Sequence, residues 1–170
     1  MPRRPEEPVA TPREELVDAL LSASRAMVAI AGRSLAGLEA EVTLPQYRAL
    51  VVLASRGPQR PVDISTELGV NPSTGTRMCD RLARKQLIRR YRSTTNRREV
   101  RLSLTPAGRQ LVEEVTLRRR EELSRFVDGM PQSWHGPVTQ ALRSLSAAVG
   151  EVPESEWWLG WAGVADVSAR

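Results

Sequence analysis

The 170-residue sequence contains one cysteine and one histidine, so it has little to offer metal or disulfide chemistry. Cys79 has no partner for an intrachain disulfide, and Cys79 with His135 supplies too few ligands for a cysteine–histidine metal site. The sequence holds no Gly-rich phosphate loop, no nucleophile elbow and no nucleophile–base pair. It therefore predicts no catalytic residues, no metal site and no cofactor, and an enzyme is not expected.

Aromatic residues and long apolar runs are also scarce. Aromatics make up 4% of the chain, so we expect a mainly aliphatic core. No apolar run approaches the roughly 18 residues that suggest a membrane span. Acidic residues, among them Glu6, Glu7 and Glu14, precede the first apolar stretch, which does not match a secretory signal. A reducing compartment fits the single cysteine, and we expect a cytoplasmic, one-domain protein without a membrane partner.

Positive charge is concentrated in one part of the chain. Residues 71–105 contain ten basic and two acidic side chains, a net charge of +8, whereas the whole chain carries +5. The other residues therefore sum to −3. A helix that fits a major groove, followed by a basic hairpin that reaches the neighbouring groove, is typical of a protein that binds duplex DNA.

Start and stop signals divide the chain into six helices. Thr11-Pro12 and Thr43-Leu44-Pro45 each combine a capping residue, an early proline and Glu or Gln at the third helical position. Apolar residues then recur at three- or four-residue steps. The expected helices span about 11–38, 45–56, 61–68, 71–85, 105–128 and 132–149.

The third and fourth helices and the residues after them form a recognisable sequence of elements. Gly69 ends the third helix, and Asn71-Pro72 begins the fourth after a turn of about three residues, which predicts a helix-turn-helix. Residues 88–92 and 100–104 alternate with period two, which predicts a hairpin. We expect Gly75, Met78, Cys79 and Leu82 on the buried face of the fourth helix, and Ser73, Arg77, Asp80 and Arg84 on the polar face.

This order of elements, with one short motif, resembles the MarR family of winged-helix transcriptional regulators over about residues 12–150. The motif is Asn96-Arg97-Arg98 followed by Leu104-Thr105 and Gly108, where the family has Asp-x-Arg, five variable residues, Leu-Thr and often a Gly three residues on. Asn96 replaces the family's Asp, so a charge pair with the wing-tip arginine would be lost although a hydrogen bond remains available.

The resemblance implies a mainly α fold, a winged helix-turn-helix with a two-stranded β wing and a helical dimerisation region. It implies a homodimer that binds double-stranded DNA, usually as a repressor released by a small aromatic or phenolic effector. The family's ligand pocket lies between the first, second and fifth helices, which would place Met27, Tyr47 and Val51 near it. An architectural or low-specificity nucleic-acid-binding protein without ligand control is the alternative function. A winged-helix interaction module working through its tryptophan tail is another.

The candidate DNA-binding residues lie on the fourth helix and on the wing. Arginine matches guanine O6 and N7, hydroxyl side chains suit phosphate or adaptable base contacts, and a wing-tip arginine suits a narrow minor groove. The predicted set is Ser73, Thr74, Thr76, Arg77, Arg81, Arg97 and Arg98.

Two further features have competing interpretations. Cys79 could be a redox sensor, but its place on the apolar face favours simple packing. Three tryptophans in the tail (Trp157, Trp158 and Trp161) could dock on the protein's own helices, close a ligand pocket or bind another protein. We expect them to fold back onto the helical dimerisation region.

The expected organisation has five parts. They are a flexible N-terminus (1–10), a first dimerisation helix (11–40), the winged helix-turn-helix (41–105), the fifth and sixth helices for dimerisation (106–150) and the Trp-rich extension (151–170).

Overall fold

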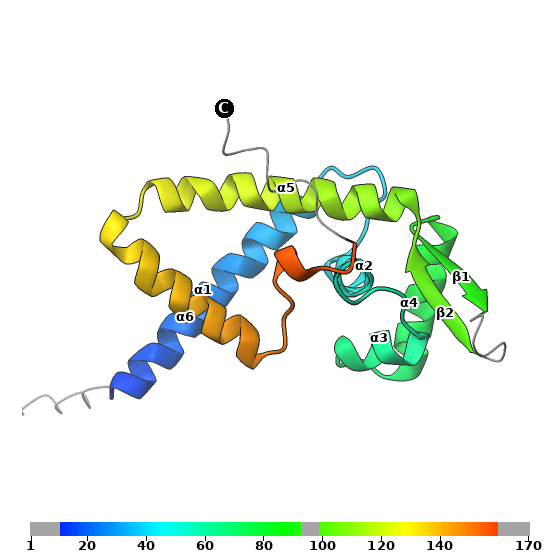
Figure 1. Cartoon of the computed structure of the whole chain (residues 1–170), viewed down its shortest axis with the longest axis horizontal. Helices are drawn as coiled ribbons and strands as arrows, with labels where there is room; N and C mark the ends of the chain where they lie inside the picture. The colour runs from blue at the N-terminus through cyan, green and yellow to red at the C-terminus, as the bar shows by residue number, and fades with distance from the viewer. Residues whose placement is uncertain (1–10, 93–98, 160–170) are drawn as a thin grey trace, which may run out of the picture.

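A computed structural model describes residues 11–92 and 99–159 of the chain. The elements in order are α1 (Pro12–Leu35), α2 (Leu44–Arg56), α3 (Pro61–Glu67), α4 (Pro72–Arg84), β1 (Ile88–Arg92), β2 (Val100–Leu104), α5 (Pro106–Asp128), α6 (Gln132–Ala148) and the 3-10 turn η1 (Glu154–Glu156). In Figure 1, α2, α3, α4 and the hairpin gather at one end, and α5 runs from them toward α6 at the other end. The predicted fold class is confirmed.

The predicted helix starts are confirmed by their capping contacts. The Thr11 backbone N–H donates to a Glu14 carboxylate oxygen at 2.7 Å, and the Thr43 N–H donates to Gln46 Oε1 at 3.0 Å. Asn71 caps α4 through its side chain. One boundary was wrong, because α1 ends at Leu35 and not near residue 38: Ala36 is extended, and Gly37 follows with φ +71°.

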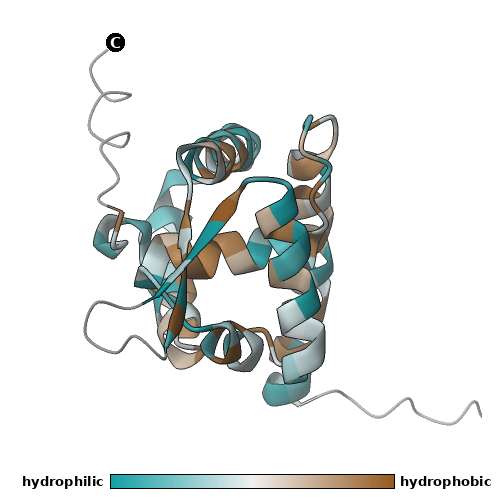
Figure 2. Cartoon of the chain, turned by 90° about the vertical axis from the view of Figure 1, so that its right-hand side faces the viewer, coloured by the Kyte–Doolittle hydropathy of each residue, from teal (hydrophilic) through white to brown (hydrophobic). Residues whose placement is uncertain are grey.

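The core surrounds α2, in which nine of the 13 residues are buried. Leu50, Leu53, Ile64 and Leu82 are completely buried and come from three different helices. Figure 2 views the winged-helix end and shows that its helices carry hydrophobic and hydrophilic residues on different sides. This aliphatic core fixes α3 and α4 relative to α2, and so fixes the direction in which the polar face of α4 points.

Helices α3 and α4 approach most closely at a glycine. A Cβ added to Gly75 would lie 2.0 Å from the hydroxyl oxygen of Ser65, which is itself buried and donates to the Pro61 carbonyl oxygen at 2.9 Å. Glycine at position 75 therefore sets the crossing of the helix-turn-helix.

The hairpin has the predicted strands, with Ile88 opposite Leu104 and Tyr91 opposite Arg101. Leu102 is fully buried and exchanges two backbone hydrogen bonds with Gln59, of 2.8 and 3.1 Å, so the loop before α3 extends the sheet edge. Val100 lies on the same side but is 42% exposed, because the strand leaves the core toward the wing. The alternating pattern predicted the two strands correctly, and the distance of each residue from the core decides how far it is buried.

Helix α6 is amphipathic but buries none of its residues. Its stripe stays open to solvent, as do apolar side chains on α1 and α5. Large exposed ones on these helices, with Val149 just after α6, include Leu16, Leu21, Val28, Leu117, Phe126, Trp134, Leu142 and Val149. Within the part of the chain that the structure describes, these apolar faces have no covering element.

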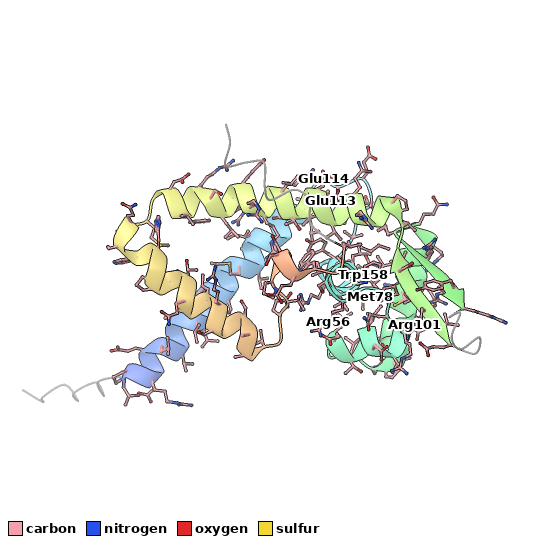
Figure 3. The ribbon with its side chains drawn as sticks, in the orientation of Figure 1. Arg56, Met78, Arg101, Glu113, Glu114 and Trp158 are labelled. Carbon is pink, nitrogen blue, oxygen red and sulfur yellow. The ribbon has the colours of Figure 1, made fainter. Side chains whose placement is uncertain are left out.

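Residues 150–159, here called the C-terminal strap, refine the prediction for the tail. The strap returns from α6 to the carboxyl end of α2, where Trp158 lies close to Gly57 (Figure 3). The Trp158 and Leu159 N–H groups donate to the carbonyl oxygens of Ser55 and Ala54. The described part of the tail folds back, as expected, and Glu154 pairs with Arg120 on α5, but its backbone contacts are with α2, where the last carbonyls of the helix need donors. Trp161 lies outside the described residues.

Candidate nucleic-acid interface and ligand cleft

The polar face of α4 points away from the core and carries four of the predicted DNA-binding residues in exposed positions. Ser73, Thr76, Arg77 and Arg81 are exposed, whereas Thr74 is half-buried. The buried face consists of Gly75, Met78, Cys79 and Leu82, as predicted. Helix α4 therefore packs against the core with one face and exposes hydroxyl and guanidinium groups on the other.

The two arginines of this face, Arg77 and Arg81, form no ion pair with any described residue. Arg77 Nε reaches only the Ser73 carbonyl oxygen, at a long 3.4 Å. Ser73 donates its hydroxyl to Asn71 Oδ1 at 2.8 Å, and the same oxygen accepts the Thr74 N–H. The cations are therefore available to an anionic partner, while the start of the helix is held by its own cap.

Other charges of the basic segment are neutralised internally, which the sequence did not indicate. Asp80 was placed on the polar face of α4, but its carboxylate lies 2.5 Å from Arg90 Nη2 on β1. Arg101 pairs with Glu99 at 2.7 Å. Lys85 keeps its charge, but its ammonium group is held by the Ala40 carbonyl oxygen, to which it donates at 2.6 Å. These contacts orient the hairpin and the end of α4, so only part of the basic segment is free to bind phosphates.

Thr105 and Gly108 of the sequence motif stabilise the base of the hairpin through hydrogen bonds and a close contact. The Thr105 hydroxyl donates to the Gln86 carbonyl oxygen at 2.6 Å and accepts the Gly108 N–H at 3.0 Å. The Thr105 N–H donates to the Leu87 carbonyl oxygen, and a Cβ on Gly108 would lie 2.0 Å from that same oxygen. The motif thus joins α5 to the turn between α4 and β1. Arg97, Arg98 and Asn96 lie outside the described residues.

The three predicted ligand-binding residues, Met27, Tyr47 and Val51, line one open cleft of about 1040 Å³. Its walls come from α1, α2, α5 and the C-terminal strap. Sequence reasoning missed several lining residues because they belong to elements distant in the chain. Those that matter below are Thr116, Arg119, Arg120 and Val152. Trp157, one of the tail tryptophans that the sequence offered as able to close a ligand pocket, lines the cleft as well.

Polar groups meet at one place on these mostly apolar walls. The hydroxyl oxygens of Tyr47 and Thr116 lie 3.5 Å apart. Burial raises the pKa of the Tyr47 phenol, and contacts with Thr116 and Arg119 offset this only partly, so the phenol stays protonated at neutral pH. Arg119 forms no ion pair with a described residue. The cleft therefore offers a hydroxyl pair and a cation to a mainly apolar ligand.

Comparison with known proteins identifies the family. Residues 42–100 match the model of the MarR family. The crystal structure of RV1404 from Mycobacterium tuberculosis is 39% identical, with a TM-score of 0.77, and the match covers 85% of this chain and 99% of that one. The chain belongs to the MarR family.

Two further relatives of this MarR protein have informative names. The transcriptional repressor MdtR of Bacillus subtilis is 37% identical over 86 residues, 51% of this chain and 56% of MdtR, so the match spans about half of that relative. A Bordetella bronchiseptica BpsR structure, described as explaining regulation of DNA binding by 6-hydroxynicotinic acid, is 25% identical with a TM-score of 0.59, covering 78% of this chain and 99% of BpsR.

Family membership establishes the general function. This MarR protein is a DNA-binding transcriptional regulator, and its relatives are regulators, not enzymes. No helix within residues 11–92 and 99–159 is long and apolar enough to cross a membrane.

The single cysteine of this MarR protein is a core residue. Cys79 is 0% exposed and packs with Leu82 and other aliphatic side chains of the core. Burial raises the pKa of its thiol, which disfavours the reactive thiolate. The packing interpretation is therefore favoured over redox sensing. His135 is exposed, and the described residues contain no group of side chains that could hold a metal ion.

Proposed function

We propose that the protein is a homodimeric, sequence-specific repressor that binds a two-fold symmetric operator and is released by a small aromatic or phenolic ligand. The observation that carries the DNA-binding part is the outward face of α4, where exposed hydroxyl groups lie beside two arginines that form no ion pair with a described residue. The seven proposed contacts are Ser73, Thr74, Thr76, Arg77, Arg81, Arg97 and Arg98. In this proposal residues 41–105 bind DNA, while residues 11–40 and 106–150 form the dimer.

Different roles are proposed for the arginines of α4 and of the wing. Arg77 lies in the first half of α4 and is assigned to base edges, whereas Arg89 on β1 is assigned to phosphate. Arg89 donates to Ser103 Oγ at 3.0 Å and its guanidinium carbon lies 5.9 Å from the Tyr91 ring centroid, so its position is held by neutral groups and its charge stays available.

The experiment is binding to operator and to unrelated duplexes across a salt series. Arg77→Ala should relax sequence preference and cost about 1–3 kcal/mol on the operator, whereas Arg89→Ala should weaken all duplexes similarly and flatten the salt slope. Arg98→Ala should also cost about 1–3 kcal/mol without unfolding the protein. If Arg77→Ala and Arg89→Ala behave alike, the division of roles is wrong. Equal affinity of the wild type for all duplexes would favour the low-specificity alternative.

The dimer proposal rests on the uncovered apolar faces of α1, α5 and α6. A soluble monomer rarely leaves contiguous apolar surface of this kind in water. A second copy is the occupant that fits, because a two-fold axis would place two copies of α4 in successive major grooves, about 34–36 Å apart.

The ligand proposal rests on the cleft. Its volume fits the size of a drug-like molecule, and its apolar walls surround the hydroxyl pair of Tyr47 and Thr116 and the cation of Arg119. The name of the BpsR structure, which concerns an aromatic ligand that regulates DNA binding, supports the same chemistry. The name of MdtR supports repression. Ligand-dependent release of operator fragments, lost in Arg119→Gln, would test this proposal.

A further inference from the structure

The C-terminal strap is held to both long walls of the cleft by charged side chains. Arg48 on α2 donates to both carboxylate oxygens of Glu151, at 2.8 and 2.5 Å. Arg120 on α5 donates to Glu154 at 2.7 Å. Two anchors three residues apart therefore tie the strap to α2 on one side and α5 on the other, so that it spans the cleft between them.

Backbone contacts fix the far end of the strap. The Trp158 N–H donates to the Ser55 carbonyl oxygen at 3.0 Å, and the Leu159 N–H donates to that of Ala54 at 3.3 Å. These carbonyls belong to the last turn of α2 and have no partner inside the helix. Arg56 of the same turn donates to the Gly150 carbonyl oxygen at 2.9 Å. The strap is thus part of the folded unit, and its position depends on α2.

Between Glu151 and the backbone contact of Trp158, two apolar side chains of the strap line the cleft. They are Val152 and Trp157. Trp157 is only 7% exposed, and its Nε1 donates to the Val152 carbonyl oxygen at 3.0 Å, which closes the strap into a compact turn. Trp158 is 60% exposed, lies beside Gly57 and does not line the cleft. Adjacent tryptophans therefore differ in whether they face a ligand.

We propose that the C-terminal strap is a wall of the effector cleft, and that Trp157 and Val152 determine which ligands it accepts. Trp157 is already covered by the protein over all but 7% of its surface, so only a small part of its indole meets the cleft, and that part favours an aromatic ring in offset or edge contact. The inference rests on the proposed ligand control and adds the residues that select the ligand. A ligand that contacts the strap also favours the docked strap over the undocked one. By linkage, docking of the strap raises ligand affinity by the same factor.

The test uses anilinonaphthalene sulfonate, an aromatic anion whose fluorescence rises in apolar sites, as the probe. Trp157→Ala should weaken its binding at least about tenfold, equivalent to about 1.4 kcal/mol. Trp158→Ala is the matched control and should change affinity less than about twofold. Val152→Ala removes fewer atoms and should also weaken probe binding. This variant keeps the proposal testable if Trp157→Ala does not fold.

A second measurement follows the strap directly. Glutamyl endopeptidase cleaves after Glu154 and Glu156 only when the strap leaves the cleft, so saturating probe should slow these cleavages in the wild type. Fragments resolved by mass spectrometry distinguish them from cleavages elsewhere. The assignment would be overturned if the probe did not slow these cleavages and if Trp157→Ala and Trp158→Ala changed probe affinity equally.

A cleft variant separates this inference from the proposal beneath it. Met27→Glu places a negative charge on the opposite wall, at a side chain that is 44% exposed and so tolerates the change. If Met27→Glu abolishes probe binding while Trp157→Ala does not weaken it, the strap assignment fails and the effector cleft remains. If Met27→Glu leaves probe binding unchanged, the probe does not occupy the cleft, and both proposals fail.

Discussion

The contact between α3 and α4 makes Gly75 the most informative single position for stability. In Gly75→Ala the new methyl carbon would lie 2.0 Å from Ser65 Oγ, 2.9 Å from Ser65 Cβ and 3.3 Å from Ser65 Cα. Rotating the Ser65 side chain cannot remove the last two contacts, and it would break the 2.9 Å hydrogen bond to the Pro61 carbonyl oxygen. The two helices must therefore move apart.

Two opposing effects set the size of the change. Alanine is about 1 kcal/mol more favourable than glycine inside a helix. Overpacking a close contact costs about 1–3 kcal/mol, and backbone displacement places this case at the upper end. The expected net loss is about 2 kcal/mol of unfolding free energy. Operator affinity should fall as well, because α4 moves relative to α3.

Urea unfolding followed by circular dichroism measures the loss. Gly32→Ala is the control, since a Cβ at that exposed helical glycine meets no atom within 4 Å, and it should stabilise the protein by up to about 1 kcal/mol. Combining Gly75→Ala with Ser65→Ala removes the closest contact and should recover part of the stability. A Gly75→Ala protein as stable as the wild type would refute the close-approach reasoning.

Three other perturbations test separate features. Leu142→Glu puts a charge into the α6 stripe and should give monomers or insoluble protein; a wild type that sediments as a monomer at micromolar concentration would contradict the dimer. Cys79 should react with iodoacetamide far more slowly in the folded than in the urea-unfolded protein, since burial raises its thiol pKa, and equal rates would contradict this. The Arg48 hydrogen bonds lower the pKa of Glu151, so its contribution to stability should be present above the unfolded value of about 4.3 and lost as pH falls through the lower folded value. Melting temperatures of wild type and Glu151→Gln should therefore converge below about pH 4, and a pH-independent difference would refute the pairing.

Local signals were enough to predict the elements and the exposed face of α4. Caps such as Thr43 with Gln46 act within four residues, so their geometry follows from adjacent sequence. The same holds for the apolar spacing from Gly75 to Leu82, which determines the buried side of a helix and therefore the side left for DNA. The two strands of the hairpin followed from their alternating pattern.

Contacts between distant segments could not be predicted in this way. The pairing of Asp80 with Arg90 needs the angle between α4 and the hairpin, and the cleft needs α1, α2, α5 and the strap together. Sequence reasoning named three cleft residues through the family resemblance and offered Trp157 only as one of three tail tryptophans that could close a pocket, but it missed Arg119. The interaction energy of such residues depends on distances in three dimensions, which no local pattern contains.

The sequence by itself determined the helices, the hairpin, the buried face of α4 and the concentration of positive charge, because these depend on neighbouring residues, periodicity and composition. The tertiary structure decided which arginines form no ion pair with a described residue, and it placed the strap between α2 and α5, with its backbone hydrogen bonds on α2. The physical reason is that the open carbonyls of Ala54 and Ser55 and the guanidinium of Arg48 become partners for residues about 100 positions away only after the core has brought α2 and the strap together.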